Sequence, residues 1–134
     1  MIVLNNMGKK AFIVDDDPNI VELFRHILEK ENLEVFTALD GEEALKKIPE
    51  AKPDIIVLDL MLPRRGGFQV LKSLQQNENT KNIPILIITG KFADGTTYDF
   101  VKSQPNVRGF YSKPIDPAVF AVDVKKILGG YDVQ

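Results

Sequence analysis

Three consecutive carboxylates, Asp15, Asp16 and Asp17, directly follow four apolar residues in the stretch KAFIVDDDPNI (residues 10–20). Two like charges about 5 Å apart repel by roughly 3 kcal/mol at an effective dielectric constant near 20. Solvent, a helix terminus or a cation has to offset this repulsion. Asp17 precedes Pro18, and this pair is typical of a helix N-cap followed by the first helical residue. Asp15 and Asp16 need a different explanation.

Other polar residues also stand where apolar runs end. Asp59 closes DIIVLD, Thr89 closes PILIIT, and Lys113 follows VRGFYS. Asp59 lies in one of the most apolar segments of the chain, and a solvated loop carboxylate would not require such surroundings. Thr89 and Lys113 are ordinary residues when each is taken alone. The interpretation therefore rests on the whole set.

The apolar segments that precede these residues have the pattern of strands. They fall at residues 10–15, 33–38, 54–59, 84–89 and 107–112. Three of them are unbroken apolar runs, which is typical of parallel strands covered on both faces. Between them lie helical patterns at residues 18–31, 66–78 and 94–103. Another helix is predicted to begin at Asp40, which forms a capping box with Glu43. The last is predicted to begin at Asp116-Pro117 and to end at Gly129-Gly130.

This alternation predicts an α/β fold with a five-stranded parallel sheet and helices on both faces. Right-handed crossovers with one reversal give the doubly wound, flavodoxin-like (βα)5 order 2-1-3-4-5, whose ligands bind at the carboxyl ends of the strands. The first and third strands are neighbours in this order, so Asp59 should lie beside Asp15 and Asp16. Three carboxylates are suitable ligands for a hard cation such as Mg²⁺, which would offset their repulsion.

Composition limits the possible classes of protein. The 134 residues suit one domain, and we expect residues 9–129 to form it, with residues 1–8 and 130–134 as tails. The formal charge is −2 and no basic run stands out, so we expect no direct nucleic-acid partner. Cysteine is absent, no apolar run approaches the length of a membrane span, and we expect a cytoplasmic location without membrane contact.

Together these residues resemble the receiver domain of two-component response regulators. The resemblance is carried by VDDDP (14–18), VLDLMLP (57–63), IITG (87–90) and YSKPID (111–116), and it covers nearly the whole chain. It implies a signalling domain that catalyses only its own phosphorylation and dephosphorylation. Asp59 matches the aspartate that accepts a phosphoryl group from a phosphohistidine.

The resemblance also implies a cofactor and its ligands, Mg²⁺ or Mn²⁺. Asp16, Asp59 and the backbone carbonyl of Met61 match the direct ligands, and Asp15 matches the acid that reaches the metal through water. Phosphoryl transfer depends mainly on positioning and on neutralising charge, which agrees with these roles.

Four further residues match the family at the last two strands. Lys113 matches the lysine that pairs with the phosphoryl oxygens, and the bond to Pro114 is expected to be cis. Thr89 matches the hydroxyl that binds the attached phosphoryl group, and Phe110 matches the aromatic residue that then rotates inward. The surface formed by the fourth helix, fifth strand and fifth helix would change shape and signal to a partner.

The implied partners are a sensor histidine kinase or phosphotransfer protein and a downstream effector domain or protein, with a phosphorylation-dependent homodimer left open. Three alternatives also remain open from the residues alone. They are a haloacid-dehalogenase-like phosphatase, because Asp15 and Asp17 follow a strand, a flavodoxin, and a receiver that acts without phosphorylation. No acidic pair follows the lysine as the phosphatase requires, and three acids in the first loop would repel a flavin phosphate.

Overall fold

The computed structural model describes residues 8–62, 66–90 and 95–129. The proposed tails at residues 1–8 and 130–134 therefore lie almost entirely outside the described residues. The strands are β1 (Lys10–Val14), β2 (Glu34–Ala38), β3 (Ile55–Asp59), β4 (Ile85–Thr89) and β5 (Val107–Ser112). The helices are α1 (Pro18–Lys30), α2 (Gly41–Ala51), α3 (Gly67–Gln76), α4 (Gly95–Ser103) and α5 (Pro117–Leu128).

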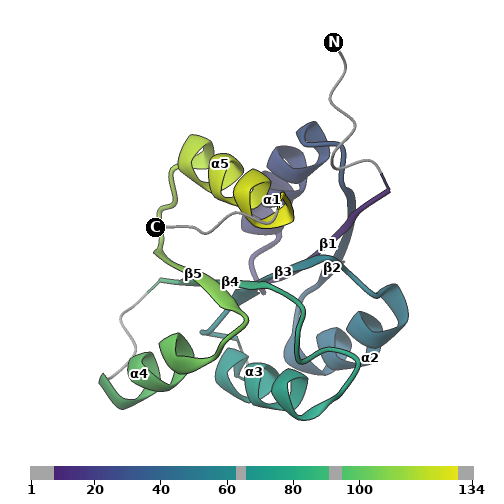
Figure 1. The fold of residues 1–134 in the computed structure, drawn as a ribbon. Helices are drawn as coiled ribbons and strands as arrows, with labels where there is room; N and C mark the ends of the chain where they lie inside the picture. Colours follow the sequence, from purple (N-terminus) through teal and green to yellow (C-terminus); the bar gives the residue numbers. More distant parts are fainter. Residues whose placement is uncertain (1–7, 63–65, 91–94, 130–134) are drawn as a thin grey trace.

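The five strands form one parallel sheet in the order β2-β1-β3-β4-β5, which confirms the predicted flavodoxin-like topology. Each strand starts within one residue of its predicted start. Figure 1 shows α1 and α5 on one face of the sheet and α2, α3 and α4 on the other. β3 and β4 are buried along their whole length, as expected for central strands covered on both faces.

Each face of the sheet has its own hydrophobic core. Phe24, Phe120 and Ile27 belong to the core under α1 and α5. Leu71 and Leu74 belong to the core under α2 and α3. Alternate side chains of every strand enter opposite cores, so the sheet is held rigidly between two apolar layers. The sheet thereby positions the residues at the carboxyl ends of its strands.

The helix starts follow the cap residues that the sequence indicated. Asp17 accepts a hydrogen bond from the Asn19 backbone at 2.9 Å, and Asp116 caps α5 in the same way. Asp40 caps α2, but the Glu43 side chain accepts from the backbone of Leu39 instead of closing the expected box on Asp40 itself. Gly129 ends α5 with φ −84°, so this end uses right-handed backbone geometry and does not need the freedom of glycine.

Candidate functional site

The sheet register brings acidic side chains from two strands to one edge. Val14 pairs with Leu58, so Asp15 and Asp59, the next residue on each strand, emerge side by side. Asp15 is fully buried and Asp59 is 2% exposed, whereas Asp16 is exposed. One carboxylate oxygen from each of these three residues lies within 4.8 Å of the others. The predicted acidic cluster therefore exists at the carboxyl ends of β1 and β3.

Lys113 reaches this cluster from the loop after β5. Its Nζ lies 3.1 Å from Asp59 Oδ2 and 2.9 Å from Asp15 Oδ2, so a single ammonium bridges the two buried carboxylates. The Lys113 backbone N–H donates to the carbonyl of Thr89 at 2.8 Å, which ties this loop to the end of β4. The peptide bond between Lys113 and Pro114 is cis.

Thr89 and Met61 complete the edge of the site. Thr89 is buried and is the last residue of β4. The Met61 backbone N–H donates to Asp59 Oδ1 at 2.9 Å, and Met61 itself is 54% exposed beside the site. Both oxygens of Asp59 thus have a partner, one from Met61 and one from Lys113, which fixes the orientation of the carboxylate.

Burial and neighbouring charges act in opposite directions on the pKa values of Asp15 and Lys113. Burial raises the pKa of Asp15, and the nearby Asp59 carboxylate adds to this, while the Asp17 backbone N–H and Lys113 act in the opposite direction. Burial alone would lower the pKa of Lys113, but its contacts with the Asp15 and Asp59 carboxylates outweigh burial and the pKa is raised. Lys113 therefore remains an ammonium while it faces the carboxylates.

The donor set suits a hard divalent cation. Mg²⁺ binds oxygen at about 2.1 Å, so two of its ligands lie at most about 4.2 Å apart. Drawing the three oxygens into that range requires only a small contraction of the cluster. Among the described residues, the buried Asp15 Oδ2 has only the ionic contact with Lys113 and no directed hydrogen bond, so it retains capacity to accept. The residues present fit Mg²⁺ or Mn²⁺.

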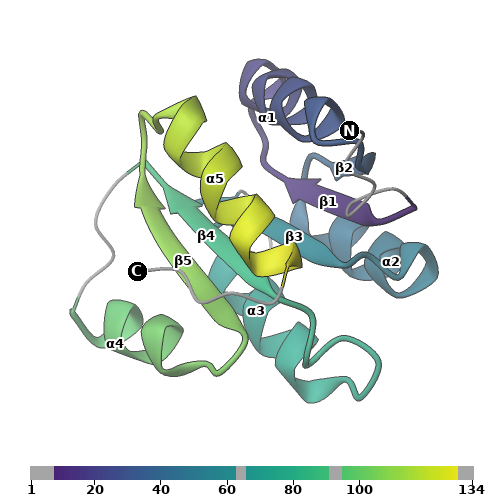
Figure 2. The same cartoon turned by 45° about the horizontal axis from the view of Figure 1, so that its top comes forward.

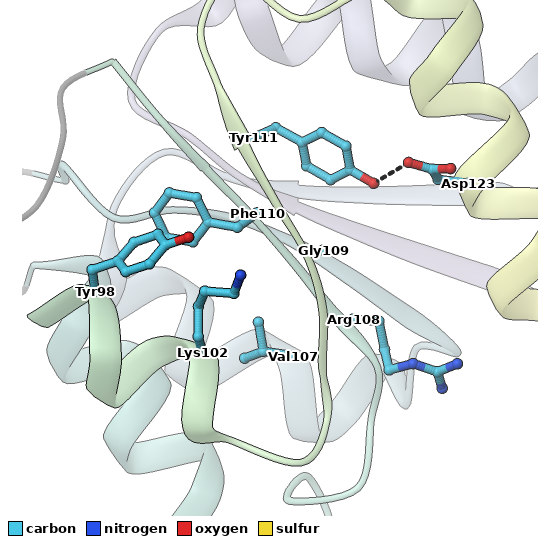
Figure 3. Close-up of a pocket in the computed structure, with 8 residues that line it drawn as sticks. All are labelled: Tyr98, Lys102, Val107, Arg108, Gly109, Phe110, Tyr111 and Asp123. Atoms are coloured by element: carbon cyan, nitrogen blue, oxygen red, sulfur yellow. Dashed lines mark hydrogen bonds between the residues drawn. The ribbon is translucent and has the colours of Figure 1, made fainter. Parts of the chain in front are cut away.

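Phe110 lies apart from the acidic cluster, on the α4 side of β5. Its ring packs against that of Tyr98 in α4, with centroids 4.9 Å apart and planes at 72°. The neighbouring residue Tyr111 points to the opposite face, where its hydroxyl donates to Asp123 in α5 (Figure 3). The edge strand β5 thus contacts α4 through Phe110 and α5 through the adjacent Tyr111.

One close contact below the site was not expected from the sequence. A Cβ on Gly67 would lie 2.1 Å from the carbonyl oxygen of Asp59 and 2.5 Å from Leu60 Cα. The first residue of α3 therefore packs directly on the backbone that carries Asp59. The adjacent pair Gly66-Gly67 was the available signal, because glycine permits such close approach of two backbones.

Comparison with known proteins identifies the family. The family model of the response regulator receiver domain matches residues 11–125. The chain belongs to this family. The receiver domain is 42% identical over 123 residues to the alkaline phosphatase synthesis transcriptional regulatory protein PhoP of Bacillus subtilis, and this match covers 91% of the chain and 49% of PhoP. It is 32% identical to the polar-differentiation response regulator DivK of Brucella anthropi, covering 92% of the chain and 98% of DivK.

Solved structures agree with this assignment. The chemotaxis protein CheY4 of Vibrio cholerae superposes with a TM-score of 0.79 at 29% identity and covers 89% of this receiver domain and 98% of CheY4. A CheY-like receiver domain from Methanospirillum hungatei superposes with a TM-score of 0.82 at 26% identity, covering 91% and 94% of the two chains. The chain spans half or less of the length of the first curated relatives that it matches. Among the described residues, no helix combines the length and apolar character needed to cross a membrane.

Proposed function

We propose that this receiver domain accepts a phosphoryl group on Asp59 from a phosphohistidine of a sensor kinase or phosphotransfer protein. An Asp59 carboxylate oxygen attacks the phosphorus, the bond from phosphorus to the histidine nitrogen breaks, and the electron pair of that bond leaves with the imidazole. The product is an aspartyl phosphate. The observation that carries the proposal is that Asp59 is buried, oriented by Met61 and contacted by Lys113 at 3.1 Å.

Each neighbouring group has a task in this reaction. Asp15, Asp16, Asp59 and the backbone carbonyl of Met61 would hold Mg²⁺, which supplies positive charge where the phosphoryl oxygens gather. Lys113 supplies a second positive charge and has only to turn its ammonium from Asp15 toward an incoming oxygen. The Thr89 hydroxyl, at the end of β4, would donate to the phosphoryl group once it is attached.

The output follows from a shift between two conformations. A phosphoryl group that draws Thr89 toward it opens space for Phe110, and the surface of α4, β5 and α5 then changes for a partner to bind. A bias of a few kcal/mol between the two conformations is sufficient for such a switch. The effector, and a homodimer formed on phosphorylation, belong to this proposal. Sedimentation with and without a phosphodonor tests the dimer.

Acetyl phosphate with Mg²⁺ provides the direct test of the phosphoacceptor. We expect intact-mass spectrometry to show one labile adduct of about 80 Da, a single phosphoryl group. Asp59→Asn should abolish the adduct, whereas Asp99→Asn, a matched change at an exposed aspartate of α4, should leave it intact. An adduct that persists in Asp59→Asn contradicts the assignment.

Two other outcomes distinguish the alternatives. Turnover of a phosphomonoester without a stable adduct would support a phosphatase. Absence of an adduct, together with capture of the same partner proteins by the wild type and Asp59→Asn, would support a receiver that acts without phosphorylation. We expect instead that partner capture differs between these two proteins only when the phosphodonor is present.

A further inference from the structure

The two ends of α4 are held by different kinds of contact. β4 ends at the site, and β5, which is parallel to it, begins at the opposite edge of the sheet. α4 ends beside the start of β5 at this far edge of the sheet, as Figure 2 shows. Its nine residues span about 13 Å. If contacts hold one end of such a helix in place, a displacement of the other end rotates the helix.

A chain of side-chain amides anchors the far end. Asn106 donates to the Ile83 carbonyl at 2.7 Å and accepts from Gln75 of α3 at 2.6 Å. The same Gln75 nitrogen donates to Gln104 at 3.0 Å, and Gln104 donates to the carbonyl of Phe100 within α4 at 3.1 Å. We call Gln75, Gln104 and Asn106 the amide chain.

The direction of every bond in the amide chain is fixed. The Ile83 carbonyl can only accept, so Asn106 must present its NH₂ group there and its oxygen to Gln75. Gln75 must then present its NH₂ group to the side-chain oxygens of both Asn106 and Gln104. Asn106 is 8% exposed, and breaking a buried bond of this kind leaves polar groups without partners, which is unfavourable. The far end of α4 is thus a specific and costly attachment.

The second half of α4 is also held by Phe100, whose ring packs on Phe68 of α3, and by the buried Val101, whereas the first half contacts β5 through an aromatic pair. Tyr98 meets the ring of Phe110 edge to face at 4.9 Å, and Lys102 Nζ lies 5.3 Å from the centre of the Tyr98 ring. A cleft of about 300 Å³ lies over β5 beside these three side chains, as Figure 3 shows. An edge-to-face ring contact contributes little beyond the apolar area that it buries, and the cleft provides space for the rings to move.

We propose that α4 pivots about the amide chain and that Tyr98 is the positioning residue that couples the orientation of Phe110 to this pivot. The inference rests on the proposed function, because it takes phosphorylation of Asp59 as the event that reorients Phe110. When Phe110 turns away, Tyr98 loses its contact and the half of α4 nearer the site changes position. The amide chain holds the far end in place, so the change is a rotation of α4 and not a translation.

Hydrogen–deuterium exchange of the full chain, with and without acetyl phosphate and Mg²⁺, tests the pivot. In the wild type we expect phosphorylation to change the exchange of peptides from the first half of α4 and to leave peptides over Gln104–Asn106 unchanged. Tyr98→Leu keeps apolar bulk but removes the ring, and should lose the response of α4 while Asp59 is phosphorylated to the same extent. Tyr98→Phe keeps the ring and is the matched control, which should respond as the wild type does.

Gln75→Leu tests the anchor from α3. We expect the phosphorylation-dependent change to extend through the far end of α4 in this variant. The pivot is overturned if Tyr98→Leu retains the wild-type response, or if the wild-type response is as large at Gln104–Asn106 as at the first half of α4. The phosphorylated fraction is measured on the same samples. A wild type that is not phosphorylated contradicts the proposed function. A phosphorylated wild type in which the exchange of α4 does not change contradicts the pivot alone.

Discussion

At the scale of single residues, the site holds charges whose arrangement opposes stability. Asp15 is fully buried next to Asp59, and burial raises its pKa. A carboxyl group whose pKa is raised by folding destabilises the folded state at any pH where it is ionised. Lys113 offsets only part of this cost. Such residues are expected where stability is exchanged for function.

Asp15→Asn should therefore stabilise the protein in the absence of divalent cations. We expect the free energy of unfolding at neutral pH to rise by about 1 kcal/mol, measured by urea denaturation in EDTA. In the wild type, ionised Asp15 destabilises the fold above its raised pKa, and this effect disappears below the pKa of Asp15 in the unfolded chain, near 4. The difference in the free energy of unfolding between Asp15→Asn and the wild type should therefore shrink as the pH falls toward 4. The control Asp99→Asn should show no such gain. A destabilised Asp15→Asn would contradict this account.

Tyr111 provides the second titration. Burial raises its pKa first, and the hydrogen bond to Asp123 raises it further, so folding favours the neutral phenol. Tyr111→Phe should lower the free energy of unfolding by about 1–2 kcal/mol at neutral pH. Wild-type stability should fall above pH about 10, where the unfolded phenol ionises and the folded one does not. The wild type should thus approach Tyr111→Phe as the pH rises, and a constant difference across this range would contradict the prediction.

At the scale of secondary-structure elements, the turn from β3 to α3 sets the position of Asp59. The first residue of α3 touches the carbonyl of the last residue of β3, and this contact leaves no space for a side chain at Gly67. A Cβ on the neighbouring Gly66 would meet nothing within 4 Å, and the backbone φ there is an ordinary −61°. The pair allows the close approach to be tested within the same turn.

Gly67→Ala should lower the free energy of unfolding by about 2–4 kcal/mol, because the methyl group collides with backbone that cannot move aside. Gly66→Ala should change it by less than about 0.5 kcal/mol. Chemical denaturation of both variants provides the comparison. We also expect Gly67→Ala to slow phosphorylation by acetyl phosphate, since it displaces the backbone of Asp59. Equal stabilities of the two variants would show that the turn relaxes freely.

At the scale of the whole molecule, cation binding should stabilise the entire fold. A ligand that binds only the folded state at one hundred times its Kd adds about 2.7 kcal/mol, which for a chain of this size raises Tm by about 8 °C. Wild-type Tm should therefore rise with Mg²⁺ concentration, and Asp16→Asn should flatten this dependence. Potassium chloride at matched ionic strength is the control. An equal rise with potassium chloride would indicate screening of charge and not a metal site.

The sequence predicted the strands, the order of the sheet and the acidic cluster, because each depends on apolar runs and on where they end. It did not predict the contacts that join distant elements. Gln75, Gln104 and Asn106 are ordinary polar residues in the sequence, and only packing makes them neighbours. Likewise Tyr98 fell within the predicted helix at residues 94–103, and its contact with Phe110 depends on how α4 is placed on the sheet. Short-range patterns do not contain this information.

The bridging position of Lys113 also affects the order in which the protein becomes competent during synthesis. Asp15 and Asp59 leave the ribosome well before their counter-charge, which follows Asp59 by 54 residues. The half-made chain therefore lacks the ammonium that pairs with these two carboxylates and that, in the proposed reaction, would pair with the phosphoryl oxygens. The proposed mechanism therefore implies that a nascent chain becomes competent to accept a phosphoryl group only after β5 and the loop that carries Lys113 have joined the sheet.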